Sequence, residues 1–275
     1  MIDPAKTLYY NLTIQCSLDG FCFVVHHQEE NKIIDIELYQ TSESTDEGTI
    51  MEALERVLFK KGLLDKPFLS TTFIVNNQYN TLIPSALFDE QEQESYLRFH
   101  HALPNGCKLF HESLKHIESV NVFALPEKQY EHVRNTWPEI KFTHQTTLFI
   151  NSVLKEEPYE SDTNIFVNVN SRSFNLAVVN QGKLEFFNTF KFNTKDDFIY
   201  FLMFAIEQQQ LASRDIPVYF TGLVSNNSEI IRLTERYIRR VRFLRPNASV
   251  NVDLSLSNTP FQYYYIPYKY FSCES

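Results

Sequence analysis

Polar side chains crowd one predicted hairpin at residues 165–180, where the sequence reads IFVNVNSRSFNLAVVN. Six of them fall close together: Asn168, Asn170, Ser171, Arg172, Ser173 and Asn175. Arg172 and Ser173 could contact a phosphate in place of a metal ion, because a guanidinium forms charge-assisted hydrogen bonds. Asparagine amides are neutral, so they cannot hold a hydrated divalent ion as carboxylates do, nor activate water as a base. These residues therefore suit binding better than catalysis.

A second polar hairpin is predicted within LTIQCSLDGFCFVV, where the polar positions are Gln15, Ser17 and Asp19. Asp19-Gly20 is a strong signal for a two-residue turn, since both residue types tolerate positive φ. Asp19 is therefore interpreted as a turn residue. Gln15 and Ser17 are the candidate binding residues of this hairpin.

The densest cationic stretch is the Arg232–Arg245 segment, within IIRLTERYIRRVRFLRP. A helix continuing to Arg240 would place three arginines on one face: Arg232, Arg236 and Arg239. Its buried side would consist of Ile230, Leu233, Tyr237 and Ile238, and its start would be a reciprocal cap between Asn226 and Glu229. As partner-binding residues, the three arginines could grip RNA, a nucleotide phosphate or an acidic protein. The preferred interpretation is a solvated face paired locally with Glu229 and Glu235.

Histidines and cysteines indicate neither a metal site nor a nucleophile. Histidines recur at His26-His27, His100-His101 and His111, without the i, i+4 spacing and glutamate of a helical zinc site. The four cysteines are Cys16, Cys22, Cys107 and Cys273, in no C-x-x-C pattern. The first two fall in predicted strands, where a small buried apolar side chain is the expected role. We expect no metal ligands and no catalytic residues.

The elements that must position these residues occur twice along the chain. The first half contains two hairpin strands, a strand at 32–39, a helix at 48–62 and a strand at 68–76. The second half contains strands at 165–169, 174–180 and 183–190, a helix at 196–212 and a strand at 218–221. Asn180-Gln181-Gly182 is its hairpin turn. Further helices are predicted within 85–103 and 125–137, and strands at 120–124 and 141–143.

We interpret this repetition as two α/β lobes, residues 1–154 and 155–275, divided at the polar, proline-bearing segment LKEEPYESDTN. The chain of 275 residues is 43% hydrophobic and 21% charged, which is typical of a globular protein. Its net charge of −9 argues against coating DNA or anionic membranes. We find no signal sequence and no apolar run of bilayer length, so we expect a cytoplasmic protein that does not insert into membranes.

The aromatic tail FQYYYIPYKYF, residues 261–271, could stack bases or anchor a partner protein. We predict a final strand instead, with alternate tyrosines buried and Pro267 at an edge or bend. Any exposed part of the tail would be an interface candidate.

A three-stranded meander, a helix and a further strand, present twice in one chain, resemble the actin-like ATPase (ribonuclease H-like) fold shared by actin, heat-shock chaperones and sugar kinases. The resemblance implies two similar lobes, each with a mixed sheet flanked by helices. In that family, a glycine-rich hairpin turn from each lobe holds phosphates, and an acidic residue near each turn serves magnesium or the attacking water. A third element, which shelters the adenosine, resembles IPVYFTGLVSNNSEIIRL, with Gly222 retained.

At the positions that match the family's nucleotide site, most of the chemistry is replaced. The degenerate cofactor-binding positions are Gln15, Ser17, Asn168, Ser171, Arg172, Ser173 and Gly222. More narrowly, LTIQCSLDGFCFVV and TGLVSNNSEIIRLTERYI resemble an uncharacterised family of Bacteroidetes proteins with this fold. That resemblance implies a fold and no particular substrate.

We therefore expect a non-catalytic binding or scaffold protein without a cofactor, acting through a protein partner and distantly similar to the actin-like scaffold proteins of pilus and secretion assemblies. One alternative is a protein that still binds ATP or another nucleotide weakly between its lobes. A second alternative, not favoured, is nucleic-acid binding through the Arg232–Arg245 segment. The sequence specifies neither the partner nor the oligomeric state.

Overall fold

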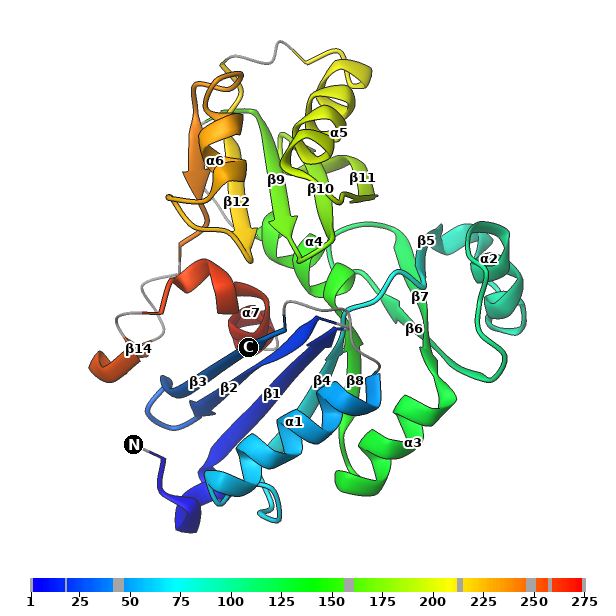
Figure 1. Ribbon diagram of the computed structural model, residues 1–275. Helices are drawn as coiled ribbons and strands as arrows, with labels where there is room; N and C mark the ends of the chain where they lie inside the picture. The colour runs from blue at the N-terminus through cyan, green and yellow to red at the C-terminus, as the bar shows by residue number, and fades with distance from the viewer. Residues whose placement is uncertain are drawn as a thin grey trace. The chain divides into compact units, whose positions relative to one another are not determined.

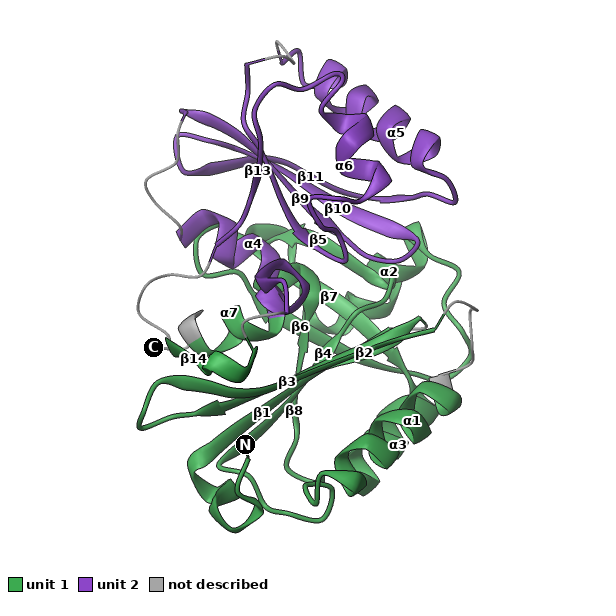
Figure 2. Cartoon of the chain, turned by 60° about the vertical axis from the view of Figure 1, so that its left-hand side comes forward, with its two compact units in different colours: residues 1–148, 247–258, 267–275 green, residues 149–246, 259–266 purple. Residues whose placement is uncertain are grey.

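The computed structural model describes residues 2–17, 19–41, 47–155, 161–211, 215–245, 251–256 and 259–273. The chain forms two compact units (Figure 2): unit 1 is residues 1–148, 247–258 and 267–275, and unit 2 is residues 149–246 and 259–266. The lobes expected from sequence differ from these units mainly near the C-terminus. There, Val252 pairs with Ile33, and the ring of Phe271 stacks on His26, so both segments join unit 1.

The main sheet of unit 1 has the strand order β14-β3-β2-β1-β4-β8 (Figure 1). Its strands are β1 (Tyr10–Ser17), β2 (Gly20–His27), β3 (Lys32–Gln40), β4 (Ser70–Val75), β8 (Lys141–His144) and β14 (Asn251–Val252). The first three form an antiparallel meander, and β4 pairs in parallel with both β1 and β8. With α1 (Glu47–Lys60) between β3 and β4, the predicted order of three strands, a helix and a strand is confirmed.

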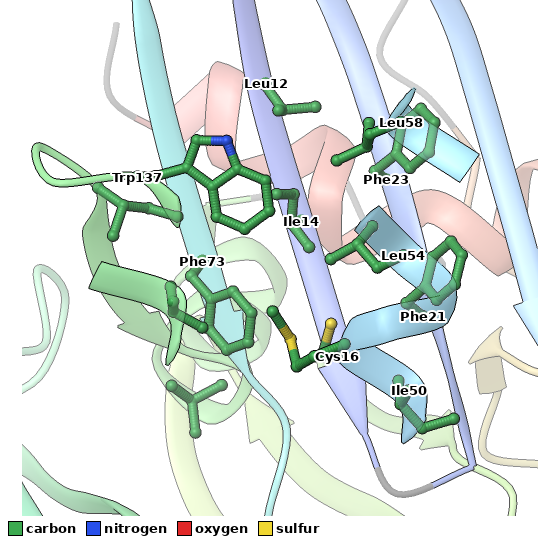
Figure 3. Packing of buried hydrophobic residues seen from close by; sticks show 14 of the residues in the cluster. Leu12, Ile14, Cys16, Phe21, Phe23, Ile50, Leu54, Leu58, Phe73 and Trp137 are labelled. Carbon is green, nitrogen blue, oxygen red and sulfur yellow. The ribbon is translucent and has the colours of Figure 1, made fainter. Parts of the chain in front are cut away.

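Alternation along β1 separates a core face from a polar face. Leu12, Ile14 and Cys16 point into the hydrophobic core of Figure 3, to which α1 and α3 (Glu127–Thr136) also contribute. Gln15 lies on the opposite face, because successive strand residues alternate. Burial raises the pKa of the Cys22 thiol to about 12 and also raises that of Cys16. The prediction that both are small buried side chains is confirmed.

A smaller antiparallel sheet, of order β5-β7-β6, completes unit 1. Its strands are β5 (Asn80–Pro84), β6 (Cys107–Ser113) and β7 (Ser119–Pro126). The 3₁₀ turns η2 (Ser85–Leu87) and η3 (Glu90–Glu92) lead from β5 into α2 (Gln93–His100), whose buried Leu97 packs on Val120 and Val122 of β7. The helices and strands predicted within 85–143 are confirmed, whereas β5 and β6 were not predicted.

Unit 2 repeats the meander in a five-stranded sheet of order β11-β10-β9-β12-β13. Its strands are β9 (Thr163–Val169), β10 (Ser173–Asn180), β11 (Lys183–Lys191), β12 (Val218–Gly222) and β13 (Val241–Phe243). The predicted turn between β10 and β11 is confirmed: Gln181 and Gly182 have φ of 48° and 73°, as a turn that matches strand twist requires. The helices α5 (Lys195–Gln208) and α6 (Glu229–Thr234) pack on one core. Helix α4 (Gln145–Lys155) precedes β9.

The aromatic tail is helical, which corrects the predicted strand at 261–271. A 3₁₀ turn, η5 (Phe261–Tyr264), leads into α7 (Tyr265–Cys273). Pro267 is tolerated there because the N–H groups of a helix's first turn have no intrahelical acceptor. Tyr264, Tyr265 and Tyr268 are buried, so they do not form the exposed interface that the tail could have supplied. The remaining 3₁₀ turns are η1 (Pro4–Tyr9) and η4 (Leu254–Leu256).

Candidate functional site

Two buried asparagines and a threonine form a row of hydrogen bonds across three strands of unit 2. Asn168 on β9 and Asn175 on β10 face each other directly in the antiparallel register. The Asn168 amide donates to Oδ1 of Asn175 at 3.2 Å, and the Asn175 amide donates to Oγ1 of Thr189 on β11 at 2.8 Å. Asn168 is 1% exposed and Asn175 4%. The amides therefore satisfy one another in a dry environment, and we call these three residues the asparagine row.

The turn between β9 and β10 is closed by its own hydrogen bonds. The backbone N–H of Asn170 donates to the carbonyl of Ser173 at 2.8 Å, which leaves Ser171 and Arg172 exposed at the tip. None of the residues from 168 to 175 has positive φ. A backbone cradle for phosphate needs successive N–H groups turned to one side, which takes a left-handed residue, commonly glycine. This turn presents side chains instead of such a cradle.

Gly222, at the end of β12, is required by packing. Its φ is +86°, and a Cβ there would lie 2.1 Å from the carbonyl oxygen of Val169 and 2.8 Å from Oδ1 of Asn168. The next residue, Leu223, donates its N–H to the same Val169 carbonyl at 2.7 Å. The glycine that the resemblance assigns to an adenosine site is thus explained by the close approach of β12 to β9.

In unit 1, the side chain of Gln15 makes a long-range contact and that of Ser17 makes local ones. The Gln15 amide donates to Oε1 of Gln145, the first residue of α4, at 2.9 Å. The Ser17 hydroxyl donates to the carbonyl of Gly20 at 3.3 Å, and it accepts from the Asp19 N–H at 3.4 Å. Residues 15 and 17 therefore support the hairpin and the neighbouring helix start.

Five consecutive polar residues, Thr143 to Thr147, are buried where β8 ends and α4 begins. The backbone N–H of His144 donates to Oε2 of Glu112 on β6 at 3.1 Å. The hydroxyls of Thr143 and Thr147 also hydrogen-bond to Glu112, and Thr147 accepts from Asn121 at 2.9 Å. This cluster was not predicted from the sequence. Its signal was the run THQTT between a strand and a helix, because polar residues are mostly exposed unless they have partners.

Burial displaces both titratable groups of this cluster toward their neutral forms. It raises the pKa of Glu112, although the hydrogen bonds from Thr147, Thr143 and His144 act in the opposite direction. It lowers the pKa of His144 to about 3, and Nδ1 of this neutral ring accepts the N–H of Thr146 at 3.1 Å. Burial of the Glu112 carboxyl group costs free energy, and its three hydrogen-bond donors compensate for part of that cost.

The arginine segment departs from its prediction. Helix α6 ends at Thr234, so the expected helix to Arg240 is wrong, and only Arg232 lies on it. After Thr234 the chain continues in turns. Of the predicted buried side, Ile238 is buried, whereas Tyr237 is 47% exposed. Ile231 and Thr234 are buried in addition. The helix is preceded by Ser228 and has no side-chain cap, so the predicted Asn226 cap is also wrong. Arg232, Arg236 and Arg239 are all exposed.

The ion pairs of this segment differ from the predicted local pairs of the arginines with Glu229 and Glu235. Glu229 binds Nζ of Lys195 on α5 at 3.0 Å, and Arg239 lies 3.6 Å from the carboxylate of Asp215. Within the described residues, Arg232 and Arg236 form no ion pair.

A cavity of about 920 Å³ lies in unit 1, away from the predicted site residues. It is lined by residues 64–71 and 135–141 and by Glu55, whose carboxylate accepts from His132 and Thr136 at 2.8 and 2.9 Å. These loops precede β4 and β8, at the amino ends of the strands, whereas open α/β sheets bind ligands at the carboxyl ends. Across the described ranges, no three His, Cys, Asp or Glu side chains are grouped to hold a metal ion.

This arrangement of strands belongs to a known class of fold. A crystallised protein of Bacteroides thetaiotaomicron, with an actin-like ATPase fold and unknown function, superposes with a TM-score of 0.78 at 21% identity, over 91% of this chain and 96% of that chain. A chain of a PilM–PilN type IV pilus biogenesis complex gives 0.60 at 14% identity, over 96% of each chain. The ethanolamine utilization protein EutJ of Carboxydothermus hydrogenoformans gives 0.52 at 10% identity, over 95% of this chain and 89% of that chain. The protein therefore has the actin-like ATPase fold, as predicted.

The family is narrower than the fold. Residues 1–241 match the family described as protein of unknown function (DUF3822), and the chain belongs to that family. None of the curated proteins matches the chain. Among the helices of the described residues, none combines the length and apolar character needed to cross a membrane.

Proposed function

We propose that this protein is a non-catalytic actin-like binding or scaffold protein whose nucleotide site is degenerate. The observation that carries the proposal is the asparagine row, Asn168, Asn175 and Thr189, in which neutral amides are buried and bonded to one another. Two of these positions are among those where the fold family's acidic residues are expected.

The chemistry of ATP hydrolysis gives this observation its weight. Magnesium prefers oxygen ligands that carry negative charge, and attacking water needs a proton acceptor. A neutral amide supplies neither a charged metal ligand nor a proton acceptor. The Asn168 amide already donates to Asn175, and the Asn175 amide already donates to Thr189. The turn at 170–173 lacks the left-handed residue that a backbone phosphate cradle needs.

A scaffold acts by binding other proteins, so a protein partner is part of the proposal. A chain of the PilM–PilN pilus biogenesis complex has the same fold, which supports the proposal that this protein also binds a protein partner, whose identity it does not give. We also propose a cytoplasmic location, which the free buried thiols of Cys16 and Cys22 support because reducing compartments keep thiols unpaired. Cell fractionation with an antibody to the protein tests that location.

The direct test is ATP hydrolysis by the purified chain with magnesium, compared with the Asn168→Ala variant. We expect no release of phosphate above the buffer rate from either protein. Magnesium-dependent turnover by the wild type that is lost in Asn168→Ala would overturn the proposal. Circular dichroism of Asn168→Ala is the control, because a loss of ATP turnover is informative only if the variant is folded.

The second candidate is phosphate-ligand binding without catalysis, favoured by the exposure of Ser171 and Arg172 at the β9–β10 turn. If ATP binds there, Arg172→Ala should weaken binding by about 1.5–3 kcal/mol, the value of a hydrogen bond to a charged group. Lys183→Ala, an exposed cation on β11, is the matched control. Equal affinity of Arg172→Ala and wild type would exclude this candidate.

A further inference from the structure

Strand β11 (Lys183–Lys191) forms an open edge of the sheet in unit 2. Among the described residues, its only neighbour in the sheet is β10, because the strand order begins with β11. The strand is nine residues long, KLEFFNTFK, and contains no proline. A long apolar edge strand is a template for pairing with another chain, because its outer N–H and C=O groups have no strand beside them. The edge of β11 is therefore a candidate contact surface.

The odd-numbered residues near the end of β11 present their backbone groups to the open edge. The N–H of Phe192, just after the strand, donates to the carbonyl of Arg172 at 3.0 Å, so the even-numbered residues face β10. The N–H of Thr189 instead donates to Oδ1 of Asn188 at 2.8 Å, in an exposed local bond. Because backbone direction alternates along a strand, the N–H and C=O groups of Phe187 also point outward. A second strand could replace the local acceptor of Thr189 with a carbonyl oxygen.

The charges of β11 are complementary to those of a second β11 in one antiparallel register. When two copies pair about a twofold axis at Asn188, Glu185 of each copy lies opposite Lys191 of the other. Opposite charges stabilise directly opposite positions of antiparallel strands. Both residues are exposed. Glu185 accepts from the Asn180 amide through Oε1 at 2.6 Å, and its Oε2 can accept from the lysine.

The same register joins backbone groups that point outward. Phe187 of one copy falls opposite Thr189 of the other, so their outward N–H and C=O groups meet. The remaining charge of the strand, Lys183, falls opposite the neutral Asn193. Moving the axis to Phe187 would set Lys183 opposite Lys191, and like charges directly opposite each other destabilise a strand pair. The charges therefore favour the first register.

The aromatic residues of β11 extend the core of unit 2 to this edge. Phe186 and Phe190 are partly buried against that core, and in the same register Phe186 of one copy lies opposite Phe190 of the other, as aromatic pairs favour. Phe190 also stacks on Phe201 of α5 at 5.7 Å, and Figure 1 shows α5 beside β10 and β11. The exposed Tyr200 and Phe204 adjoin Phe201 on the helix surface. A second copy at the edge would cover apolar surface on both elements, which adds to the small area of a strand pair.

We infer that β11 is a self-association edge: two copies of this chain pair antiparallel through β11, about a twofold axis at Asn188, and join two five-stranded sheets into one. The occupant is a second copy because the strand is complementary to itself in charge, in aromatic residues and in backbone direction. The contact is isologous, so the Glu185–Lys191 pair occurs twice. The inference goes beyond the proposed function and does not depend on it.

The test is sedimentation velocity of the full chain over a concentration series in about 0.15 M salt. At that ionic strength the screening length is about 8 Å, so the general repulsion between two copies of net charge −9 is reduced more than the contact pairs are. We expect a monomer–dimer equilibrium with a Kd below about 1 mM.

Reversing single charges tests the register. Glu185→Lys and Lys191→Glu each place like charges opposite each other twice, so each should raise the Kd at least about tenfold. The double variant Glu185→Lys/Lys191→Glu restores opposite charges, and its Kd should stay within about threefold of wild type. An equimolar mixture of the two single variants should form a heterodimer of similar affinity, because the lysines of one variant then face the glutamates of the other.

Matched controls separate the edge from the net charge. Lys128→Glu and Glu139→Lys make the same changes of charge at exposed positions of unit 1, and neither should change the Kd more than about twofold. Phe187→Pro removes an outward N–H without removing a bond to β10, so it should abolish the dimer, whereas Phe187→Ala keeps that N–H and should still dimerise. Circular dichroism checks that both variants are folded.

Three results would overturn the inference. A chain that stays monomeric up to about 1 mM would leave the edge of β11 to a strand of a different protein. A dimer that neither single charge reversal weakens would use another surface. Single variants that are weakened but recover neither as the double variant nor in the mixture would contradict the register. ATP turnover would refute the proposed function and leave these results unaffected.

Discussion

Restoring one carboxylate in the asparagine row, by the change Asn168→Asp, tests whether that row is a dry structural element. The new carboxylate oxygen would replace the Asn168 amide nitrogen, which now donates to Oδ1 of Asn175 at 3.2 Å. Asn175 could rotate its amide to donate to the new carboxylate, and the Thr189 hydroxyl could reverse to donate to Asn175. The hydrogen bonds would thus be rescued, and the cost that stays is the burial of a charge at a position that is 1% exposed.

The magnitude follows from proton linkage. A fully buried carboxyl group has its pKa raised by up to about 3–5 units from an unfolded value of about 3.9. At pH 7 the charge can therefore cost at most the roughly 3.1 units between pH 7 and 3.9, which is about 4 kcal/mol at about 1.36 kcal/mol per unit. We expect a loss of about 2–4 kcal/mol at pH 7. Because the folded pKa is raised, this loss should shrink as pH falls and vanish near pH 4, where the unfolded carboxyl is also protonated.

The assay is urea unfolding of Asn168→Asp and wild type between pH 4 and pH 8, followed by far-ultraviolet circular dichroism. Circular dichroism is chosen because the chain's only tryptophan, Trp137, lies in unit 1 and Asn168 lies in unit 2. Asn188→Asp is the control, since Asn188 is exposed on β11 of the same sheet, and we expect it to cost less than about 0.5 kcal/mol.

A difference between Asn168→Asp and wild type that is independent of pH, or below about 0.5 kcal/mol at pH 7, would refute the reasoning that the row is dry. The double variant Asn168→Asp/Asn175→Asp tests in addition whether the site can hold magnesium. Two carboxylates so close together should destabilise unit 2 further, and magnesium at millimolar concentration should not restore its stability. Recovery of stability with magnesium would mean that the site is shaped to hold a metal ion.

Three further predictions concern the packing of Gly222 and the buried cluster. Gly222→Ala should lower the free energy of unfolding by at least about 3 kcal/mol, because the new Cβ would lie 2.1 Å from the Val169 carbonyl oxygen. Gly62→Ala is the control: its Cβ would have its nearest neighbour at 3.7 Å, so it should cost about 1 kcal/mol in the same urea titrations. His144→Gln should flatten the pH dependence of the unfolding free energy of unit 1, measured by Trp137 fluorescence. The pKa of His144 is lowered to about 3, so below about pH 6.5 only the unfolded state binds the proton, and the wild type loses about 1.4 kcal/mol per pH unit relative to the variant. Parallel curves of stability against pH for the two proteins would contradict this prediction. Glu112→Ala should lower the free energy of unfolding by about 3 kcal/mol, because the donors around Glu112 lose their acceptor, whereas Glu112→Gln should stay within about 1 kcal/mol of wild type at pH 7. A loss below about 1 kcal/mol in both variants would mean that Glu112 is not the shared acceptor.

Local sequence signals predicted the repeated units well. Alternation in β1 and the turn at Gln181-Gly182 specify each meander through contacts between neighbouring strands, so the short-range pattern was sufficient. The turn predicted at Asp19-Gly20 is displaced by one residue, because Gly20 already belongs to β2 and pairs with Ser17. The strands β5 and β6 were missed because each lies at the edge of a small sheet and is only partly buried, so neither has a continuous apolar run.

The features that were not predicted depend on contacts between residues far apart in the sequence. The helix expected to reach Arg240 ends at Thr234, and the buried Ile238 joins the core of unit 2 from the segment that follows the helix. The tail is helical, and its hydrophobic pattern did not distinguish a short buried helix from a strand. At the candidate site, Asn168 and Asn175 were identified from the sequence, but the hydrogen bonds that join them to Thr189 were not. The acceptor of the Asn175 amide lies on another strand, and the buried run at 143–147 depends on Glu112, far upstream.

The central claim, that the nucleotide site has lost its function, is tested most directly by calorimetric titration of the full chain with ATP in the presence and absence of magnesium. We predict no saturable heat at millimolar nucleotide, corresponding to a binding free energy weaker than about −4 kcal/mol, and no effect of magnesium. Saturable binding that is strengthened by magnesium would contradict it, because the neutral amides of Asn168 and Asn175 give the ion no charged ligand.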